Sequence, residues 1–106
     1  MSIETVNEAS GCCIRINDEL TLSTASLFAR TLNEALESNR SVAIDLTGVT
    51  DIDCAGLQIL LMARKEALLR NRVVRFIGHN PVVMECLHMM NLINFFKFEP
   101  TPRIAS

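Results

Sequence analysis

The fold of this chain is decided by one stretch, residues 45–57, which has the sequence DLTGVTDIDCAGL. A short apolar run precedes it and a helical pattern follows, so the stretch leads from a buried strand through a polar loop into a helix. Asp53 suits the N-cap of that helix, because its carboxylate can accept hydrogen bonds from first-turn amides. Val49 and Ile52 can anchor the loop inward, and Gly56 would let another backbone come close. Such a loop is both a common connection and a usual location of function, and the residues alone favour neither interpretation.

Strands and helices alternate around this stretch. Short apolar or alternating runs predict the strands, and amphipathic patterns predict the helices. The predicted strands are 3–6, 12–16, 41–46, 73–78 and 95–98. The first predicted helix follows residues 22–24 and runs to about 38, the second spans about 55–70, and the third begins at 81. The order β-β-α-β-α-β-α-β predicts an α/β fold with a mixed β-sheet and helices packed against it. Strands joined by helices are expected to run parallel, and the first two strands are expected to form an antiparallel hairpin. The strand 41–46 is expected to be central in the sheet. No linker or repeat appears, so residues 1–106 are expected to form a single domain.

The first and third helices have recognisable starts and buried stripes. Ser23 or Thr24 can cap the first helix. Asn80 followed by Pro81 opens the third helix, with Pro at the position where no amide donor is needed. The residues predicted to form the buried stripes are Phe28, Leu32 and Ala35 on the first helix and Val83, Cys86, Leu87 and Met90 on the third.

Composition argues against several classes of partner. The formal net charge is −2 and the ten Lys and Arg are scattered, which gives no footprint for nucleic acid. No apolar run reaches the roughly 18 residues of a membrane helix, and no signal peptide is evident. We therefore expect a cytoplasmic protein without membrane insertion. The four cysteines form no CxxC pair and are expected to be free thiols, most of them small core residues. Cys12 and Cys13 point to opposite faces of their strand, which argues against a bond between them.

The sequence carries no enzyme signature. His79 follows a strand, and His88 falls on the polar side of the third helix. A nucleophile pair of Cys54 and His79 is conceivable, but no spacing requires it. HxxxH and CxxC metal patterns and a phosphate-binding GK[ST] loop are missing from the sequence. We expect no enzymatic activity, no catalytic residue, no metal and no cofactor.

Residues 45–57 resemble the signature of STAS domains, the bacterial anti-sigma-factor antagonists and their relatives. The likeness lies in an apolar strand ending in Asp, a Thr-Gly-Val turn, an Ile-Asp pair and a Gly-Leu pair, and it extends over nearly the whole chain. The resemblance implies a non-catalytic signal-transduction module that regulates transcription. Such a module binds an anti-sigma factor or switch kinase through the loop and helix 53–69. In many relatives the partner phosphorylates a Ser or Thr where the loop meets the helix, and the added charge ends binding.

Cys54 stands at the phosphoacceptor-equivalent position, and Ala55 occupies the neighbouring position that is often Ser. A Ser/Thr kinase needs a hydroxyl, so the usual phosphorylation cannot occur at either residue. Thr47 and Thr50 are better suited to hydrogen-bonding the loop backbone. One hypothesis is constitutive binding, with Cys54 as an inert residue in a Ser-sized slot. The other is a redox sensor at Cys54, since a helix N-terminus stabilises a thiolate, although the neighbouring Asp53 opposes it.

The second helix has two contrasting faces. One face carries Gly56, Leu60, Ala63 and Ala67, which permit close packing on the sheet. The opposite face is a mixed stripe in which two apolar residues, Met62 and Leu69, are expected to face water, which indicates a partner surface. The residues expected to bind the partner are Asp53, Cys54, Ala55, Gly56, Gln58, Met62, Lys65 and Leu69.

Two other functions remain open. The same fold can serve as an accessory subunit of a lipid-transport ABC complex, where the partner is the ABC ATPase. A thiol-dependent or nucleotide-binding protein is a further alternative, although no residue of this chain demands it.

Overall fold

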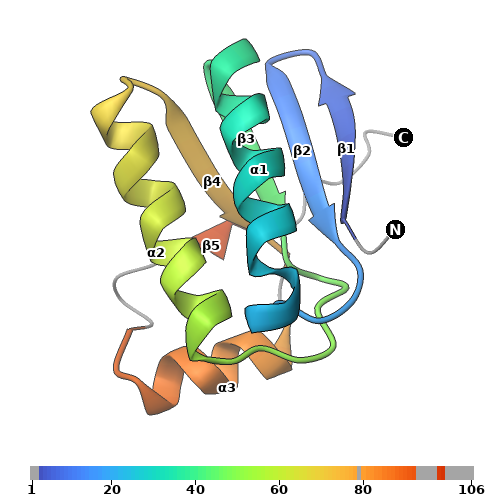
Figure 1. The fold of residues 1–106 in the computed structure, drawn as a ribbon, viewed down its shortest axis with the longest axis vertical. Helices are drawn as coiled ribbons and strands as arrows, with labels where there is room; N and C mark the ends of the chain where they lie inside the picture. The colour runs from blue at the N-terminus through green and yellow to red at the C-terminus, as the bar shows by residue number, and fades with distance from the viewer. Residues whose placement is uncertain (1–2, 79, 93–97, 100–106) are drawn as a thin grey trace.

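The computed structural model describes residues 3–78, 80–92 and 98–99. Its first seven elements follow the order that the sequence predicts (Figure 1). The strands are β1 (Ile3–Glu8), β2 (Gly11–Ile16), β3 (Ser41–Asp45), β4 (Val73–Ile77) and β5 (Phe98–Glu99), and the helices are α1 (Leu22–Ser38), α2 (Cys54–Leu69) and α3 (Pro81–Met89). None of the helices in these ranges is both long enough and apolar enough to cross a bilayer.

The strands form one mixed sheet in the order β1-β2-β3-β4-β5. β1 and β2 pair antiparallel, and every later pair is parallel, as expected for strands that are connected through helices. β3 lies at the centre, and its residues 42–44 are all buried, which confirms the prediction for this strand. The predicted last strand, 95–98, lies mostly outside the described residues, as does His79. Within the described ranges, Phe98 lies opposite Phe76 in a two-residue pairing with β4.

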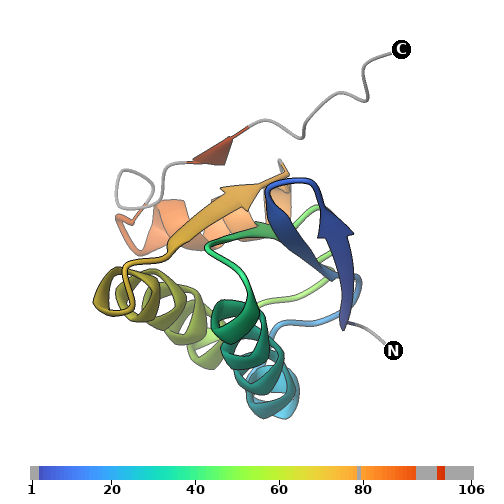
Figure 2. The same ribbon diagram turned by 90° about the horizontal axis from the view of Figure 1, so that it is seen from above.

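Two helices cover one face of this sheet, and the main core lies beneath them. α1 and α2 run side by side on that face (Figure 2), and α3 crosses below the end of α2 (Figure 1). The three helices share one hydrophobic cluster with the sheet; its fully buried side chains include Phe28, Leu36, Leu60, Val83, Leu87, Ile14, Ile44 and Leu46. The other face of the sheet carries a small cluster of Cys13, Ala43 and Ile77.

The alternation predicted for β2 is confirmed. Cys12, Ile14 and Ile16 face the main core, whereas Cys13 faces the small cluster. All four cysteines are free. Burial, and then the charge of Glu8, raises the pKa of the Cys13 thiol to about 11. Cys12 and Cys13 therefore act as small apolar core residues, as expected, but the prediction does not extend to the exposed Cys54.

The predicted cap of α1 is wrong. The N-cap is Thr21, so the helix begins at Leu22, before both Ser23 and Thr24. Thr24 instead occupies the third helical position, where its hydroxyl accepts the backbone N–H of Thr21 at 3.1 Å and donates to the Glu19 carbonyl at 3.0 Å. A hydroxyl at the third helical position can thus bond the backbone at the helix start without being the N-cap. The sequence pattern does not distinguish these two positions.

The predicted stripe of α3 is only partly correct. Val83 and Leu87 are buried and Cys86 is half-buried, but Met90 is 52% exposed. The helix ends at Met89 and Met90 is its C-cap, followed by Asn91 with φ 59°. The chain leaves the helical path before Met90 can complete the stripe.

Asn80 connects α3 to the loop that follows β3. Its Oδ1 accepts the N–H of Val82 at 2.8 Å, which caps α3 as predicted. Its Nδ2 also donates to the carbonyl oxygens of Leu46 and Val49, both at 2.7 Å, and to that of Thr47 at 3.1 Å. The Asn80 side chain is buried, and its amide joins three carbonyls of one loop; that of Leu46 also accepts the N–H of Val49 at 3.1 Å. Asn80 therefore fixes the first half of the loop that leads to Asp53.

We expect Asn80→Asp to lower the free energy of unfolding by about 3 kcal/mol, although the variant keeps an oxygen that can cap α3. The carboxylate offers no N–H to the loop carbonyls and places negative charge against them. Urea denaturation of both proteins measures the difference. Asn71→Asp, at an exposed position, is the matched control. An Asn80→Asp variant as stable as the wild type would contradict the proposed anchoring.

Candidate functional site

The N-termini of α1 and α2 meet at the carboxylate of Asp53. Asp53 is the N-cap of α2, and its Oδ1 accepts the N–H of Gly56 at 2.9 Å, as the sequence predicts. Its Oδ2 accepts the N–H of Leu22, the first residue of α1, at 3.0 Å. Each helix N-terminus carries a partial positive charge, and one carboxylate offsets both. The site is thus a junction between two helices, which the local sequence does not reveal.

The hydrogen bonds to Asp53 stabilise its ionised form. The N–H of Gly56, followed by that of Leu22, lowers the pKa of the Asp53 carboxyl below its ordinary value of 3.8. The carboxylate is therefore ionised at neutral pH, where it holds both helix ends. Its stabilising contribution is lost when the pH falls through the lowered pKa.

The loop before Asp53 is also bound to the segment that leads into α1. Leu20 donates its N–H to the Asp51 carbonyl at 2.8 Å and accepts the N–H of Asp53 at 3.3 Å. Residues Leu20 and Ile52 form a parallel bridge. A methyl group added at Gly56 would overlap the carbonyl oxygen of Leu20, so the prediction of a close backbone approach at Gly56 is confirmed. The loop is therefore held on one side by Leu20 and on the other by Asn80.

The structure places the predicted binding residues along one helix and its cap. The side chains of Asp53, Cys54, Gln58, Met62, Lys65 and Leu69 are exposed. Met62 and Leu69 are 62% and 71% exposed, so the expectation that both apolar residues face water is confirmed. Ala55 is half-buried and Gly56 is buried against Leu20. Leu69 is the last residue of α2, about 22 Å from its start at about 1.5 Å per residue.

Cys54 is the first residue of α2, and its thiol is exposed, so it does not fill a buried slot. Burial, followed by the neighbouring Cys54 and Asp53, raises the pKa of the Cys86 thiol, which places this part of α3 near the junction. The expectation that Thr47 and Thr50 bond the loop backbone through their hydroxyls is wrong. Their hydroxyls donate to carboxylates, Thr47 to Asp45 at 2.6 Å and Thr50 to Asp18 at 3.4 Å.

Leu22 is a residue of this surface that the sequence analysis omits. It is 76% exposed, and its amide is bound to Asp53, so its apolar side chain belongs to the same junction as Cys54. A Leu at the start of a helix, outside the buried stripe of Phe28 and Leu32, was the available signal. Its position beside Asp53 follows only from the long-range hydrogen bond.

We expect Asp53→Asn to lower the melting temperature at neutral pH, because an amide keeps one acceptor but loses the charge that faces two helix ends. The difference from the wild type should persist down to the ordinary carboxyl pKa of 3.8 and vanish only below it. Thermal melts across this pH range measure it, with Asp51→Asn, exposed in the same loop, as the control. A gap that stays constant through acidic pH would rule out the ionised carboxylate as its cause.

Comparison with known proteins assigns the chain to a family. The family model "STAS domain" matches residues 1–105, and no curated protein matches the chain. An anti-sigma factor antagonist from Mycobacterium paratuberculosis superposes with a TM-score of 0.80 at 20% identity, over 93% of this chain and 85% of the other. A STAS domain protein from Planctomyces limnophilus gives 0.79 at 19%, over 94% and 91%. The Bacillus cell fate determinant SpoIIAA in its phosphorylated form gives 0.73 at 10%, over 95% and 92%. At such identities the solved structures show a shared fold. The family itself is shown by the match over residues 1–105: the chain belongs to the STAS domain family.

Proposed function

We propose that this protein is a non-catalytic regulatory module that binds a partner protein of the anti-sigma-factor or switch-kinase type. The binding surface is the loop and helix 53–69. The observation that carries the proposal is the exposed stripe of α2, in which Met62 and Leu69 are 62% and 71% exposed beside the polar Gln58 and Lys65. The proposed setting is the bacterial cytoplasm, where such partners control transcription.

The anchoring of α2 supports this surface. Asp53 holds the start of the helix through Gly56, and the face with Leu60 and Ala63 is fully buried against the core. A helix held in this way presents its outer side chains at little further entropic cost on binding. Exposed Met and Leu side chains gain the most from being covered by a partner, and Met adapts to different surfaces. The polar neighbours are suited to the rim of such an interface.

The similar proteins support the same role. The relatives from Mycobacterium paratuberculosis and Planctomyces limnophilus are described as an anti-sigma factor antagonist and an anti-sigma-factor antagonist domain protein. The similar structure of SpoIIAA shows that protein in its phosphorylated form. In the present chain, Cys54 and Ala55 carry no hydroxyl. We therefore propose that docking is constitutive, in the sense that phosphorylation at these two positions does not end it.

We expect Met62→Glu to abolish most partner binding without a loss of stability, because it places a charge at the centre of an apolar contact. The wild-type chain serves as bait in an extract of the native host, and the captured proteins are identified by mass spectrometry. The expected partner is an anti-sigma factor or switch kinase, whose affinity is then measured by calorimetry. Met89→Glu, at a methionine of α3 that is 78% exposed, is the matched control. Unchanged affinity of Met62→Glu would contradict the proposed surface, and capture of permease and ATPase subunits would favour an ABC complex.

We expect Cys54→Ser to create a phosphoacceptor. A serine hydroxyl at the first position of α2 would be exposed as the thiol is, and a phosphate there would face the helix N-terminus. Incubation with the captured kinase and ATP should add one phosphate to the variant and none to the wild type, as measured by intact mass. The double change Cys54→Ala with Ala55→Ser tests the neighbouring position. Phosphate on the wild-type chain at residues 53–56 would refute constitutive docking.

A further inference from the structure

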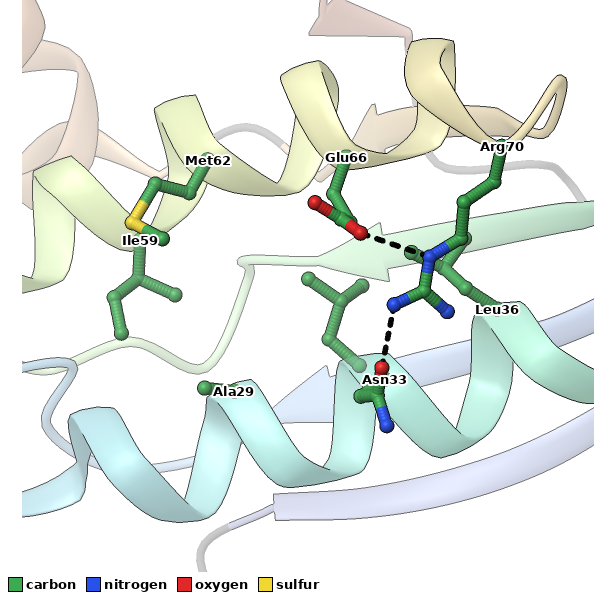
Figure 3. A pocket seen from close by; sticks show the side chains of 8 residues that line it. Ala29, Asn33, Leu36, Ile59, Met62, Glu66 and Arg70 are labelled. Carbon is green, nitrogen blue, oxygen red and sulfur yellow. Dashed lines mark hydrogen bonds and ion pairs between the residues drawn. The ribbon is translucent and has the colours of Figure 1, made fainter.

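A pocket of about 170 Å³ lies between α1 and α2, away from the junction at Asp53 (Figure 3). Leu32 and Leu36, both buried, form its floor. Ala29 faces Ile59 and Met62 across the gap, and its single methyl group leaves the space between the helices unfilled. The pocket opens to the surface beside the exposed Ala29, Asn33 and Met62.

One end of the pocket is polar and is closed by Arg70. The guanidinium donates from Nε to Glu66 at 2.9 Å and from Nη2 to the Asn33 side-chain oxygen at 2.5 Å, so it bridges α2 and α1 (Figure 3). A guanidinium carries five N–H donors and accepts nothing, so a ligand atom at this end has to be an acceptor. The Glu66 carboxylate already neutralises the guanidinium and would repel a second carboxylate. A neutral acceptor fits this end best.

We propose that this pocket binds small neutral carbonyl compounds, such as ketones or short esters, of about six to ten non-hydrogen atoms. The size follows from comparison with an apolar cavity of about 150 Å³, which holds a benzene molecule. The carbonyl oxygen accepts a hydrogen bond from Arg70, and the alkyl or ring portion packs on Leu32, Leu36 and Ile59. The polar end fixes the orientation of the ligand, and the apolar walls supply most of the affinity.

Met62 connects the pocket to the proposed docking surface. It lines this pocket and also a groove of about 540 Å³ on the outer side of α2, together with Gln58 and Lys65. Met is unbranched and flexible, so its side chain can repack when one of the two hollows is filled. A bound ligand therefore alters a side chain on which we expect the partner to dock.

The test is a titration of the ¹⁵N-labelled protein with 2-heptanone, followed by amide chemical shifts. We expect shifts at 29–36 and 59–70 with a dissociation constant on the order of 1 mM. Heptanoate, which has the same chain with a carboxylate, should bind at least tenfold more weakly. Arg70→Met should weaken ketone binding by about tenfold through loss of the hydrogen bond.

Ala29→Leu fills the pocket and should abolish the shifts, and because Ala29 is an exposed helical position the variant is expected to fold. Ser26→Leu, exposed on the same helix and outside the pocket, is the matched control and should bind as the wild type does. The proposal is overturned if Ala29→Leu or Arg70→Met binds the ketone as well as the wild type. Equal binding of heptanoate, or shifts confined to other faces, would also overturn it.

Discussion

The carboxylate of Asp53 accepts backbone hydrogen bonds from the first turns of two helices, through Oδ1 from Gly56 and through Oδ2 from Leu22. Two helix N-termini at one place would repel each other through their dipoles, and a single carboxylate between them offsets both. α1 and α2 begin at the same end of the sheet because they follow β2 and β3, which are parallel, and they run side by side (Figure 2). The Asp53 carboxylate joins their first turns. The seam between the helices, the pocket within it and the outward stripe of α2 all depend on that shared start. Gly56 completes the arrangement, because its missing side chain lets α2 approach the Leu20 carbonyl.

The sequence analysis succeeded where a contact is local. The caps of α2 by Asp53 and of α3 by Asn80 join residues two or three positions apart, and such spacing is visible in the chain. The second role of each side chain joins Asp53 to Leu22 and Asn80 to Leu46, over 31 and 34 positions. Such pairs form only when separate elements pack, so a single sequence does not contain a signal for them. The error at Thr24 has a related cause, since a first-turn hydroxyl can serve the turn from more than one position.

The candidate surface was predictable to a similar extent. A helical period separates the buried Leu60 and Ala63 from the exposed Met62, and the structure bears out both faces. The position of Leu22 beside Asp53 and the pocket beside Ala29 were not predictable, because each results from the distance between α1 and α2. A period shows which side of a helix is apolar, but it does not show how closely two helices approach. Structures with 10% to 20% identity to this chain share its fold, which fits a fold specified by apolar pattern and caps more than by individual side chains.

The distribution of the cysteines has a practical consequence. Cys12 and Cys13 are buried, Cys86 is half-buried with a raised thiol pKa, and Cys54 is the exposed one of the four. A thiol-reactive fluorophore should therefore attach first at the start of α2, without removal of the native cysteines. The dye would stand beside Leu22 and Asp53, where contact with another molecule changes its surroundings. The natural chain thus carries its own attachment point for an optical reporter.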